Sequence, residues 1–257
     1  MIATLTEELR HLRLALMVLL GTVGGLAARG ARRPGDVRRQ CLEIGNRSVL
    51  FVSTTLGFIG MVLVFQTCLQ VNRVTGDLSQ VGAEFVKILV HEFGPSLTAM
   101  MLATRVGAGI AAEVGSMTVT EQVDALRMSN VDPVRYLIVP RFLASILMTP
   151  VLAIYGVAVA FVIGTLTAWQ SFGVNPRIFF DLSRVGGGDL LTFAVKSLAY
   201  GAAIPIMSGA SGLGARGGSV GVGAATTRAV ISSSFVVILL DFLISSLAIL
   251  TWQSGDF

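Results

Sequence analysis

Five long apolar stretches, separated by polar breaks, dominate this sequence of 257 residues. Crossing a lipid bilayer takes about 20 residues of α-helix, and each stretch is long enough. Inside a bilayer every backbone N–H and C=O must be hydrogen-bonded internally, which an α-helix achieves within one segment. The composition agrees, because 13% of the residues are charged, against about 25% in soluble domains. The sequence therefore predicts an all-α integral membrane protein with spans at about 44–71, 81–103, 134–169, 190–213 and 226–252.

The first 40 residues differ in character from the spans. Apolar residues recur there at steps of three and four, on the face opposite the charged residues. These apolar residues are Leu5, Leu9, Leu12, Leu16, Leu19 and Val23. This pattern predicts an amphipathic helix lying in the membrane interface, followed by a linker with five arginines suited to anionic head groups or to setting the topology. Acidic residues before the apolar run and arginines after it argue against a signal peptide. We expect a division into this N-terminal part, 1–40, and a five-span membrane domain, 41–257.

The arginines are distributed unequally between the two sides of the predicted spans. With the N-terminus inside, the outer side carries only Arg73, Arg177 and Arg184, and all the others fall in the N-terminal part or on the inner side. Because positively charged loops stay in the cytoplasm, we predict a cytoplasmic N-terminus and a C-terminus on the opposite side. The net charge of +4 follows from this pattern and does not indicate nucleic-acid binding.

The longest polar break, residues 105–141, separates the second span from the third. Thr118 and Glu121 have the spacing of a capping box, in which each side chain satisfies one backbone N–H at a helix start. Apolar residues then repeat at helical spacing, with charged residues on other faces. We predict a short cytoplasmic helix here, ended at Ser129-Asn130 and followed by a helix starting at Asp132-Pro133. Such a helix is either a solvated connector or a docking element for another protein.

Ionisable side chains also lie inside the predicted spans, where they are costly and therefore functional candidates. They are Glu84, Lys87, His91, Glu92, Lys196 and Asp241. Similar depths along their spans make a Lys196–Asp241 ion pair plausible, with Glu92 at the same level. Two interpretations stay open: a structural ion pair between helices, or a polar layer lining a cavity for a lipid head group. Pro95, Pro140, Pro150 and Pro205 are expected to kink their spans.

Several kinds of chemistry are excluded. His91-Glu92 begins like the zinc motif HExxH, but Pro95 occupies the place of the second histidine, so we expect neither a metal site nor a catalytic residue. The glycine-rich segment 212–223, interpreted as a loop before the last span, has no P-loop lysine. The chain therefore cannot hydrolyse ATP through a P-loop of its own. Cys41 and Cys68 would be about 40 Å apart in a helix, so no disulfide is expected.

The polar break also resembles a known family. The matching residues are Ala111-Ala112-Glu113, Thr120-Glu121-Gln122, Asp124-Ala125-Leu126, Val131-Asp132-Pro133 and Pro140-Arg141, together with Gly221, Gly223, Ala225-Thr226-Thr227 and Asp241-Phe242 near the end. This pattern is similar to the MlaE/YrbE family, the permease subunits of ABC-type lipid transporters that work with MCE proteins. The resemblance extends from about Gly45 to the end of the last apolar stretch.

The resemblance implies a homodimeric permease in the inner membrane of a bacterium, with a periplasmic C-terminus, moving phospholipids between inner and outer membranes. A cytoplasmic ABC ATPase, which binds ATP and magnesium, would dock on a coupling segment at about 113–130, and a periplasmic MCE-domain protein and often a STAS-domain protein would complete the assembly. The expected coupling residues are Glu113, Glu121, Asp124, Leu126 and Arg127, and the expected substrate-cavity residues are Glu92, His91, Lys196, Asp241 and Lys87.

Two alternatives belong to other functional classes. An ATP-independent secondary transporter or channel would use the intramembrane charges as a proton relay. It is less favoured because the sequence shows no inverted repeat and has a prominent predicted cytoplasmic helix. A membrane enzyme of lipid metabolism is disfavoured because the sequence has no recognisable catalytic constellation.

Overall fold

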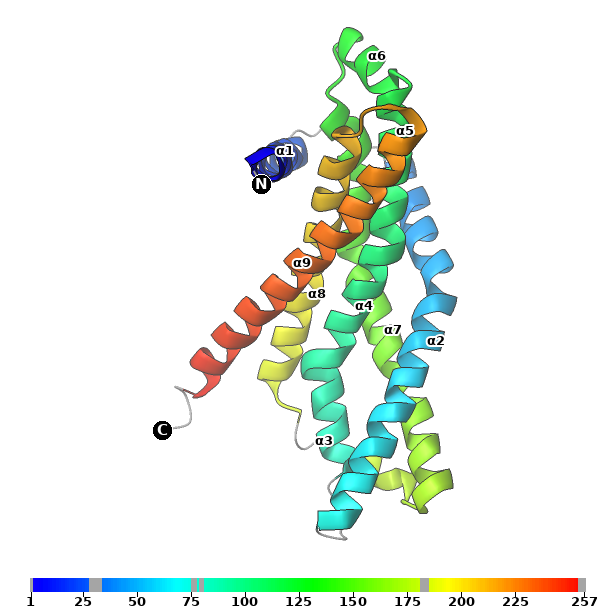
Figure 1. Ribbon diagram of the computed structural model, residues 1–257. Helices are drawn as coiled ribbons and strands as arrows, with labels where there is room; N and C mark the ends of the chain where they lie inside the picture. The colour runs from blue at the N-terminus through cyan, green and yellow to red at the C-terminus, as the bar shows by residue number, and fades with distance from the viewer. Residues whose placement is uncertain (1, 28–33, 75–77, 79–80, 181–184, 254–257) are drawn as a thin grey trace. The chain divides into compact units, whose positions relative to one another are not determined.

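The computed structural model describes residues 2–27, 34–74, 78, 81–180 and 185–253, which are helical apart from short connections (Figure 1). The helices are, in chain order, α1 (Ile2–Ala27), α2 (Pro34–Val74), α3 (Val81–Ile88), the π-helical turn η2 (Leu89–Phe93), α4 (Gly94–Leu102), the π-helical turn η3 (Ala103–Gly107), α5 (Ala108–Val119), α6 (Gln122–Met128), the π-helical turn η4 (Val134–Ile138), α7 (Val139–Phe172), the 3₁₀ turn η5 (Pro176–Phe180), α8 (Gly187–Leu213) and α9 (Gly218–Gln253).

Within the described residues, five helical runs are long and apolar enough to cross a membrane: Gly35–Val74, Val81–Val119, Val134–Phe172, Gly187–Leu213 and Gly218–Thr251. The predicted all-α class and the five spans are confirmed. The runs are longer than the predicted spans, most clearly the second, which continues from residue 103 to Val119. Hydropathy marks only the apolar part of a helix, whereas the backbone hydrogen-bond ladder continues into polar sequence.

The glycine-rich segment 212–223 is not the loop that the sequence predicts. Gly212 lies in α8, and Gly221 and Gly223 lie in α9, so the connection shrinks to the few residues between the two helices. Gly217 and Gly218 supply the turn with φ angles of 83° and 71°, which glycine adopts without strain. Gly212 is needed for packing, because a Cβ there would lie 2.8 Å from the Cβ of Val114 in α5.

The chain forms two compact units, each assembled from separate stretches of sequence. The first unit comprises Met1–Asn46, Leu102–Met148 and Ala199–Leu239, and the second comprises Arg47–Met101, Thr149–Leu198 and Leu240–Phe257. In the first unit, α1 turns His11, Ala15 and Val18 inward, while Leu12 and Leu16 of its leucine stripe are exposed. That exposure suits the lipid-facing side of an interfacial helix.

The second unit has a continuous apolar core. Val52, Leu56 and Val64 of α2 are fully buried in it, together with Ala160 of α7. Small residues let the helices approach closely, since a Cβ at Gly60 would lie 2.6 Å from the carbonyl oxygen of Ala160. The turn η5 packs on α3, and the rings of Phe85 and Phe179 meet edge to face at 6.1 Å. The sequence predicts an outer loop at 170–189 with two helix-start signals, Asn175-Pro176 and Asp181. Asn175 does start η5, by accepting a hydrogen bond from the N–H of Arg177, whereas Asp181 lies outside the described residues.

Two of the four prolines expected to kink spans lie two residues after the end of a π-helical turn. Pro95 is the second residue of α4, after η2, and Pro140 is the second residue of α7, after η4. Proline lacks the N–H that closes an α-helical turn, and its ring clashes with the carbonyl four residues earlier. A widened turn accommodates both effects. Pro150 and Pro205 lie inside α7 and α8 instead.

Candidate functional site

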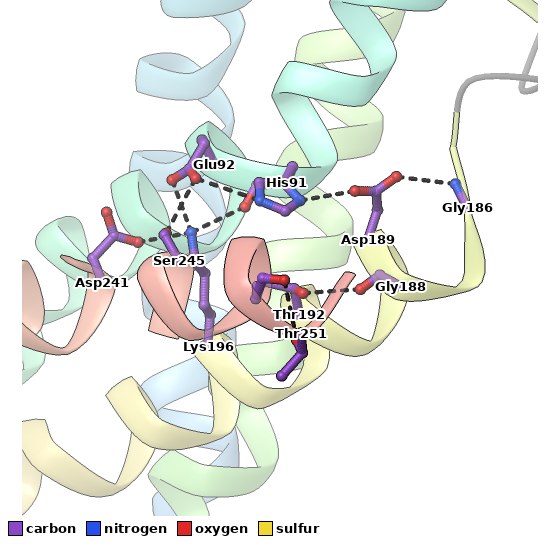
Figure 2. Close-up of polar contacts among 11 residues, drawn as sticks. His91, Glu92, Gly186, Gly188, Asp189, Thr192, Lys196, Asp241, Ser245 and Thr251 are labelled. Carbon is purple, nitrogen blue, oxygen red and sulfur yellow. Dashed lines mark hydrogen bonds and ion pairs between the residues drawn. The ribbon is translucent and has the colours of Figure 1, made fainter. Parts of the chain in front are cut away.

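Five ionisable residues of the second unit come together in one cluster, which we call the polar layer (Figure 2). His91 and Glu92 belong to η2, Asp189 and Lys196 to α8, and Asp241 to α9. Each lies in a helical run long enough to span a membrane. Charges in such segments are costly unless they are paired, so the pairing geometry decides what the layer can do.

Lys196 is the centre of the polar layer. Its side chain is 0% exposed, and its Nζ lies 2.8 Å from Oε2 of Glu92 and 3.0 Å from Oδ1 of Asp241. Nζ also donates a hydrogen bond of 3.1 Å to the carbonyl oxygen of His91. A lysine ammonium has three N–H donors, so these three acceptors account for all of them.

The backbone of η2 contributes the third acceptor because of Pro95. In an α-helix the carbonyl of His91 would accept from the N–H four residues later, and Pro95 has none. The π-helical turn Leu89–Phe93 immediately precedes Gly94 and Pro95. The carbonyl of His91 is thereby left to bind Lys196 from α8. Such widened turns are frequent at functional sites in helices.

Both carboxylates that hold Lys196 have a second, neutral partner. The hydroxyl of Ser245 donates to Oε1 of Glu92 at 3.1 Å, and the hydroxyl of Ser96 donates to Oδ1 of Asp241 at 2.8 Å. Glu92 is 41% exposed and Asp241 is 28% exposed. The ammonium is therefore enclosed, while the carboxylates of Glu92 and Asp241 remain partly exposed.

His91 extends the layer to the start of α8. Its Nδ1 lies 2.8 Å from Oδ1 of Asp189, and its Nε2 lies 3.6 Å from Oε1 of Glu92. The other oxygen of Asp189 accepts a hydrogen bond of 2.9 Å from the backbone N–H of Gly186. A continuous series of polar contacts thus runs from Gly186 to Asp241 (Figure 2).

The structure brings together four of the five residues expected to form the polar layer. The predicted Lys196–Asp241 ion pair is present, and Glu92 and His91 join it. Lys87, which shares a helical face with His91 in sequence, is exposed on α3 and takes no part in these ion pairs. That face is interrupted because η2 is a π-helical turn, and an extra residue per turn rotates the residues that follow. The role of the layer in transport stays a prediction.

The sequence missed Asp189, Ser96 and Ser245. The predicted fourth span begins at about 190, which leaves Asp189 at the end of the outer loop, but α8 already begins at Gly187. Its place in the first turn of a helix, where acidic residues are favoured, was the available signal. The two serines carry no signal of their own, because serine is ordinary in membrane helices and only the fold aims these hydroxyls at carboxylates.

The predicted capping box in the polar break is wrong. Thr118 still belongs to α5, and its hydroxyl donates to the carbonyl of Val114 at 2.8 Å. Glu121 precedes α6 in the left-handed conformation, with a φ of 61°, and its side chain makes no capping hydrogen bond. The helix α5 continues through the residue that the motif assigns to a helix start, so the N-cap of α6 is Glu121, three residues later than predicted.

The other expected features of α6 are present. The N–H of Val131 bonds to the carbonyl of Leu126, and the N–H of left-handed Asn130 bonds to that of Arg127, which is a Schellman ending. Asp124 and Arg127 pair at 3.0 Å on the exposed face. Asp132 caps the next helix by accepting from the N–H of Val134.

The coupling residues are only partly as exposed as the sequence predicts. Glu113, Glu121, Asp124 and Arg127 are exposed, but Leu126 is half-buried because it shares the inner side of α6 with fully buried Val123. Met128, which the sequence did not indicate, is 90% exposed at the end of the helix. Charged and apolar groups are therefore presented side by side.

An ion pair ties together the two helices on either side of α6. Nη2 of Arg141, in α7, lies 2.8 Å from Oε2 of Glu113, in α5. The Arg141 side chain is 7% exposed, and Nη1 donates to the carbonyl of Leu137. These residues line a cavity of about 230 Å³ together with Asp36, Arg39, Gln40, Met117, Tyr136, Leu137 and Pro140. The sequence indicated Arg141 only as a topology signal and a family residue.

Comparisons with known proteins identify close similarities over this whole region. A family model described as "Permease MlaE" matches residues 37–247, which include the polar layer and α6. A probable ABC transporter permease protein of Synechocystis sp. is 36% identical over 214 residues, 81% of each chain. The intermembrane phospholipid transport system permease protein MlaE of Haemophilus influenzae is 32% identical over 212 residues, again 81% of each chain. The chloroplastic protein TRIGALACTOSYLDIACYLGLYCEROL 1 of Arabidopsis thaliana is 30% identical over 235 residues, 91% of this chain and 67% of that protein.

Proposed function

Because this chain belongs to the MlaE permease family, we propose that it moves phospholipids or related lipids between the inner and outer membranes of a bacterium. As a family member it is a multi-pass permease subunit of an ABC-type transporter. One observation carries the lipid assignment: the relative in Haemophilus influenzae, similar over 81% of this chain, is named for intermembrane phospholipid transport. The family match, over residues 37–247, includes α6 and the polar layer.

ATP hydrolysis belongs, in this proposal, to a separate cytoplasmic subunit that binds ATP and magnesium, while this chain carries no cofactor. The sequence contains no G-x-x-x-x-G-K-[ST] motif, and its two lysines, Lys87 and Lys196, lie within membrane-spanning runs. The partner would dock on the segment 113–130, where α6 presents the Asp124–Arg127 pair and the apolar side chain of Met128.

The Glu113–Arg141 ion pair supports a mechanical role for this segment. It links α5 to α7, the helices that lead into and out of α6. Closure of the ATPase subunits would move Thr118–Met128, and the ion pair would pass that movement to both helices together. Rocking of the spans in two copies of the chain would then open and collapse a lipid cavity, with Glu92, Lys196 and Asp241 on its wall.

The same proposal includes the orientation of the chain in the membrane and its partner proteins. The N-terminus and α6 face the cytoplasm, and the C-terminus faces the periplasm, as the arginine distribution indicates. A second copy of the chain forms the other half of the permease, in the inner membrane. A periplasmic MCE-domain protein accepts or delivers lipid, and a STAS-domain protein accompanies the ATPase.

One observation favours a second candidate function. The contacts from Asp189 through His91 and Glu92 to Lys196 form an uninterrupted series of titratable groups. Such a series in a membrane suits a proton relay, and hence an ATP-independent secondary transporter or channel.

Affinity purification of the chain from its host in mild detergent, followed by mass spectrometry, separates the two functions. The proposal predicts an ATPase subunit and an MCE-domain protein in stoichiometric amounts, and ATP-dependent movement of fluorescent phospholipid after reconstitution in liposomes. A variant of the ATPase that cannot hydrolyse ATP is the control and should abolish movement. Recovery of the chain alone, moving substrate without ATP, would establish the secondary transporter instead.

A further inference from the structure

The polar layer carries an excess of negative charge among the residues that the structure describes. Its carboxylates are Glu92, Asp189 and Asp241, and its basic groups are Lys196 and His91. The layer is formally negative even when His91 is protonated. An unbalanced charge is costly within a membrane-spanning segment, so a cation arriving at the layer is favoured.

Donors and acceptors are also unequally available in this layer. Lys196 is 0% exposed, and its three N–H donors are already directed at Glu92, Asp241 and the His91 carbonyl. It has no donor left for a phosphate. Glu92 and Asp241 are 41% and 28% exposed, and each ionised carboxylate has about four acceptor positions. His91 is 23% exposed, but both of its ring nitrogens face carboxylates of the layer, Asp189 and Glu92. The most exposed groups of the layer are therefore the acceptors of Glu92 and Asp241.

We propose that the polar layer binds the ammonium group of a lipid head group, through Glu92 and Asp241, and does not bind its phosphate. The inference rests on the proposed lipid transport and names the substrate class. A primary ammonium, as in ethanolamine lipids, offers three N–H donors to these carboxylates. A choline group has the charge but no N–H donor, and a glycerol head group leaves only the phosphate charge, which the carboxylates repel. The expected order of retention is ethanolamine, then choline, then glycerol lipids.

The test uses the full chain with whatever subunits co-purify, in nanodiscs of equal parts phosphatidylethanolamine, phosphatidylcholine and phosphatidylglycerol. Native mass spectrometry then measures the lipid retained after delipidation. We expect ethanolamine over glycerol lipid by a factor on the order of ten, which corresponds to one charge-assisted hydrogen bond at a partly exposed site. If the wild-type protein retains the three lipids equally, or prefers the glycerol lipid, that result is sufficient to overturn the inference.

Two variants locate the preference. Glu92→Gln keeps the shape and an acceptor but removes the charge, and should bring the ratio of ethanolamine to glycerol lipid close to one. Glu84→Gln is the matched control on α3, a half-buried position outside the polar layer, and should leave the ratio unchanged. A preserved ratio in Glu92→Gln overturns the assignment. If Glu92→Gln does not yield folded protein, Asp241→Asn replaces it with the same expectation.

The failure of this inference can be distinguished from the failure of the proposed function. ATP-dependent lipid movement without head-group preference would overturn the inference only. A preference for ethanolamine lipid in a protein that binds no ATPase would support the inference and count against the ABC-transporter proposal.

Discussion

The ammonium of Lys196 lies 3.1 Å from the carbonyl oxygen of His91. This hydrogen bond joins α8 to η2, and it exists because the residue four positions after His91 is proline. A backbone carbonyl that would otherwise be saturated within its helix thus becomes a ligand for a buried cation. The local rule that proline cannot donate has a direct consequence for the geometry of the polar layer.

Pro95→Ala should weaken this arrangement. The alanine N–H can bond to the His91 carbonyl and compete with Lys196, so we expect ATP-driven lipid movement to fall severalfold while the protein still folds. Transport in liposomes and the melting temperature in detergent measure the two effects. Pro150→Ala, inside α7, is the control and should leave transport nearly unchanged; equal effects of the two variants would contradict a specific role for Pro95.

Lys196→Met should destabilise the protein by about 3 kcal/mol, because it leaves two carboxylates without their shared buried counter-ion. The triple variant Lys196→Met, Glu92→Gln, Asp241→Asn removes the uncompensated charges and should recover most of that loss. Chemical denaturation in detergent, followed by tryptophan fluorescence, measures both. A triple variant no more stable than Lys196→Met would show that packing, not charge, dominates.

The Glu113–Arg141 ion pair should respond asymmetrically to loss of either partner. Arg141 is 7% exposed and Glu113 is 52% exposed, so Glu113→Gln strands a buried guanidinium, whereas Arg141→Met leaves a carboxylate that water can solvate. We expect Glu113→Gln to cost about 2 kcal/mol and Arg141→Met about 1 kcal/mol or less. Unfolding measurements on both variants decide the order, and the reverse order would contradict this account of the pair.

Glu121→Gly should raise stability by about 0.5–1 kcal/mol, since glycine adopts the left-handed conformation without the cost that a side chain incurs. Glu121→Ala keeps that cost and should change stability little. The melting temperatures of the two variants measure the difference. A lower melting temperature for Glu121→Gly than for Glu121→Ala would show that the Glu121 side chain stabilises the turn in a way that the backbone does not explain.

The double variant Asp124→Ala, Met128→Ala should lose the ATPase subunit in a pull-down while keeping its melting temperature, because both side chains are exposed. Leu126 is a poorer choice for this test, since it is half-buried and its loss would also affect packing. Arg177→Ala, an exposed change in η5, is the control. Undiminished recovery of the ATPase with the double variant would rule out this face of α6 as the docking surface.

The sequence by itself determined the membrane-embedded helical class, the five spans and the short helix α6. It also determined the ending of α6 at Asn130 and the cap at Asp132. These features depend on patterns of neighbouring residues: apolar length sets a span, and helix ends follow from which backbone groups lack a partner within the chain. The Lys196–Asp241 pair could also be predicted from the sequence, because a charge inside a span has few possible partners.

Only the tertiary structure decided which polar groups meet. The capping box failed because helix α5 continues past Thr118, and a motif of two residues cannot outweigh the hydrogen-bond ladder of a packed helix. Asp189 and Ser245 contact the polar layer because α8 and α9 bring them to η2, and Ser96 of α4 contacts it because α9 brings Asp241 to that hydroxyl. Lys87 is not part of the polar layer, because the π-helical turn η2 rotates His91 away from the helix face that carries Lys87. Contacts between residues more than ninety positions apart depend on how the helices pack against one another. Hydrophobic periodicity contains no information on which residues of two packed helices lie at the same level.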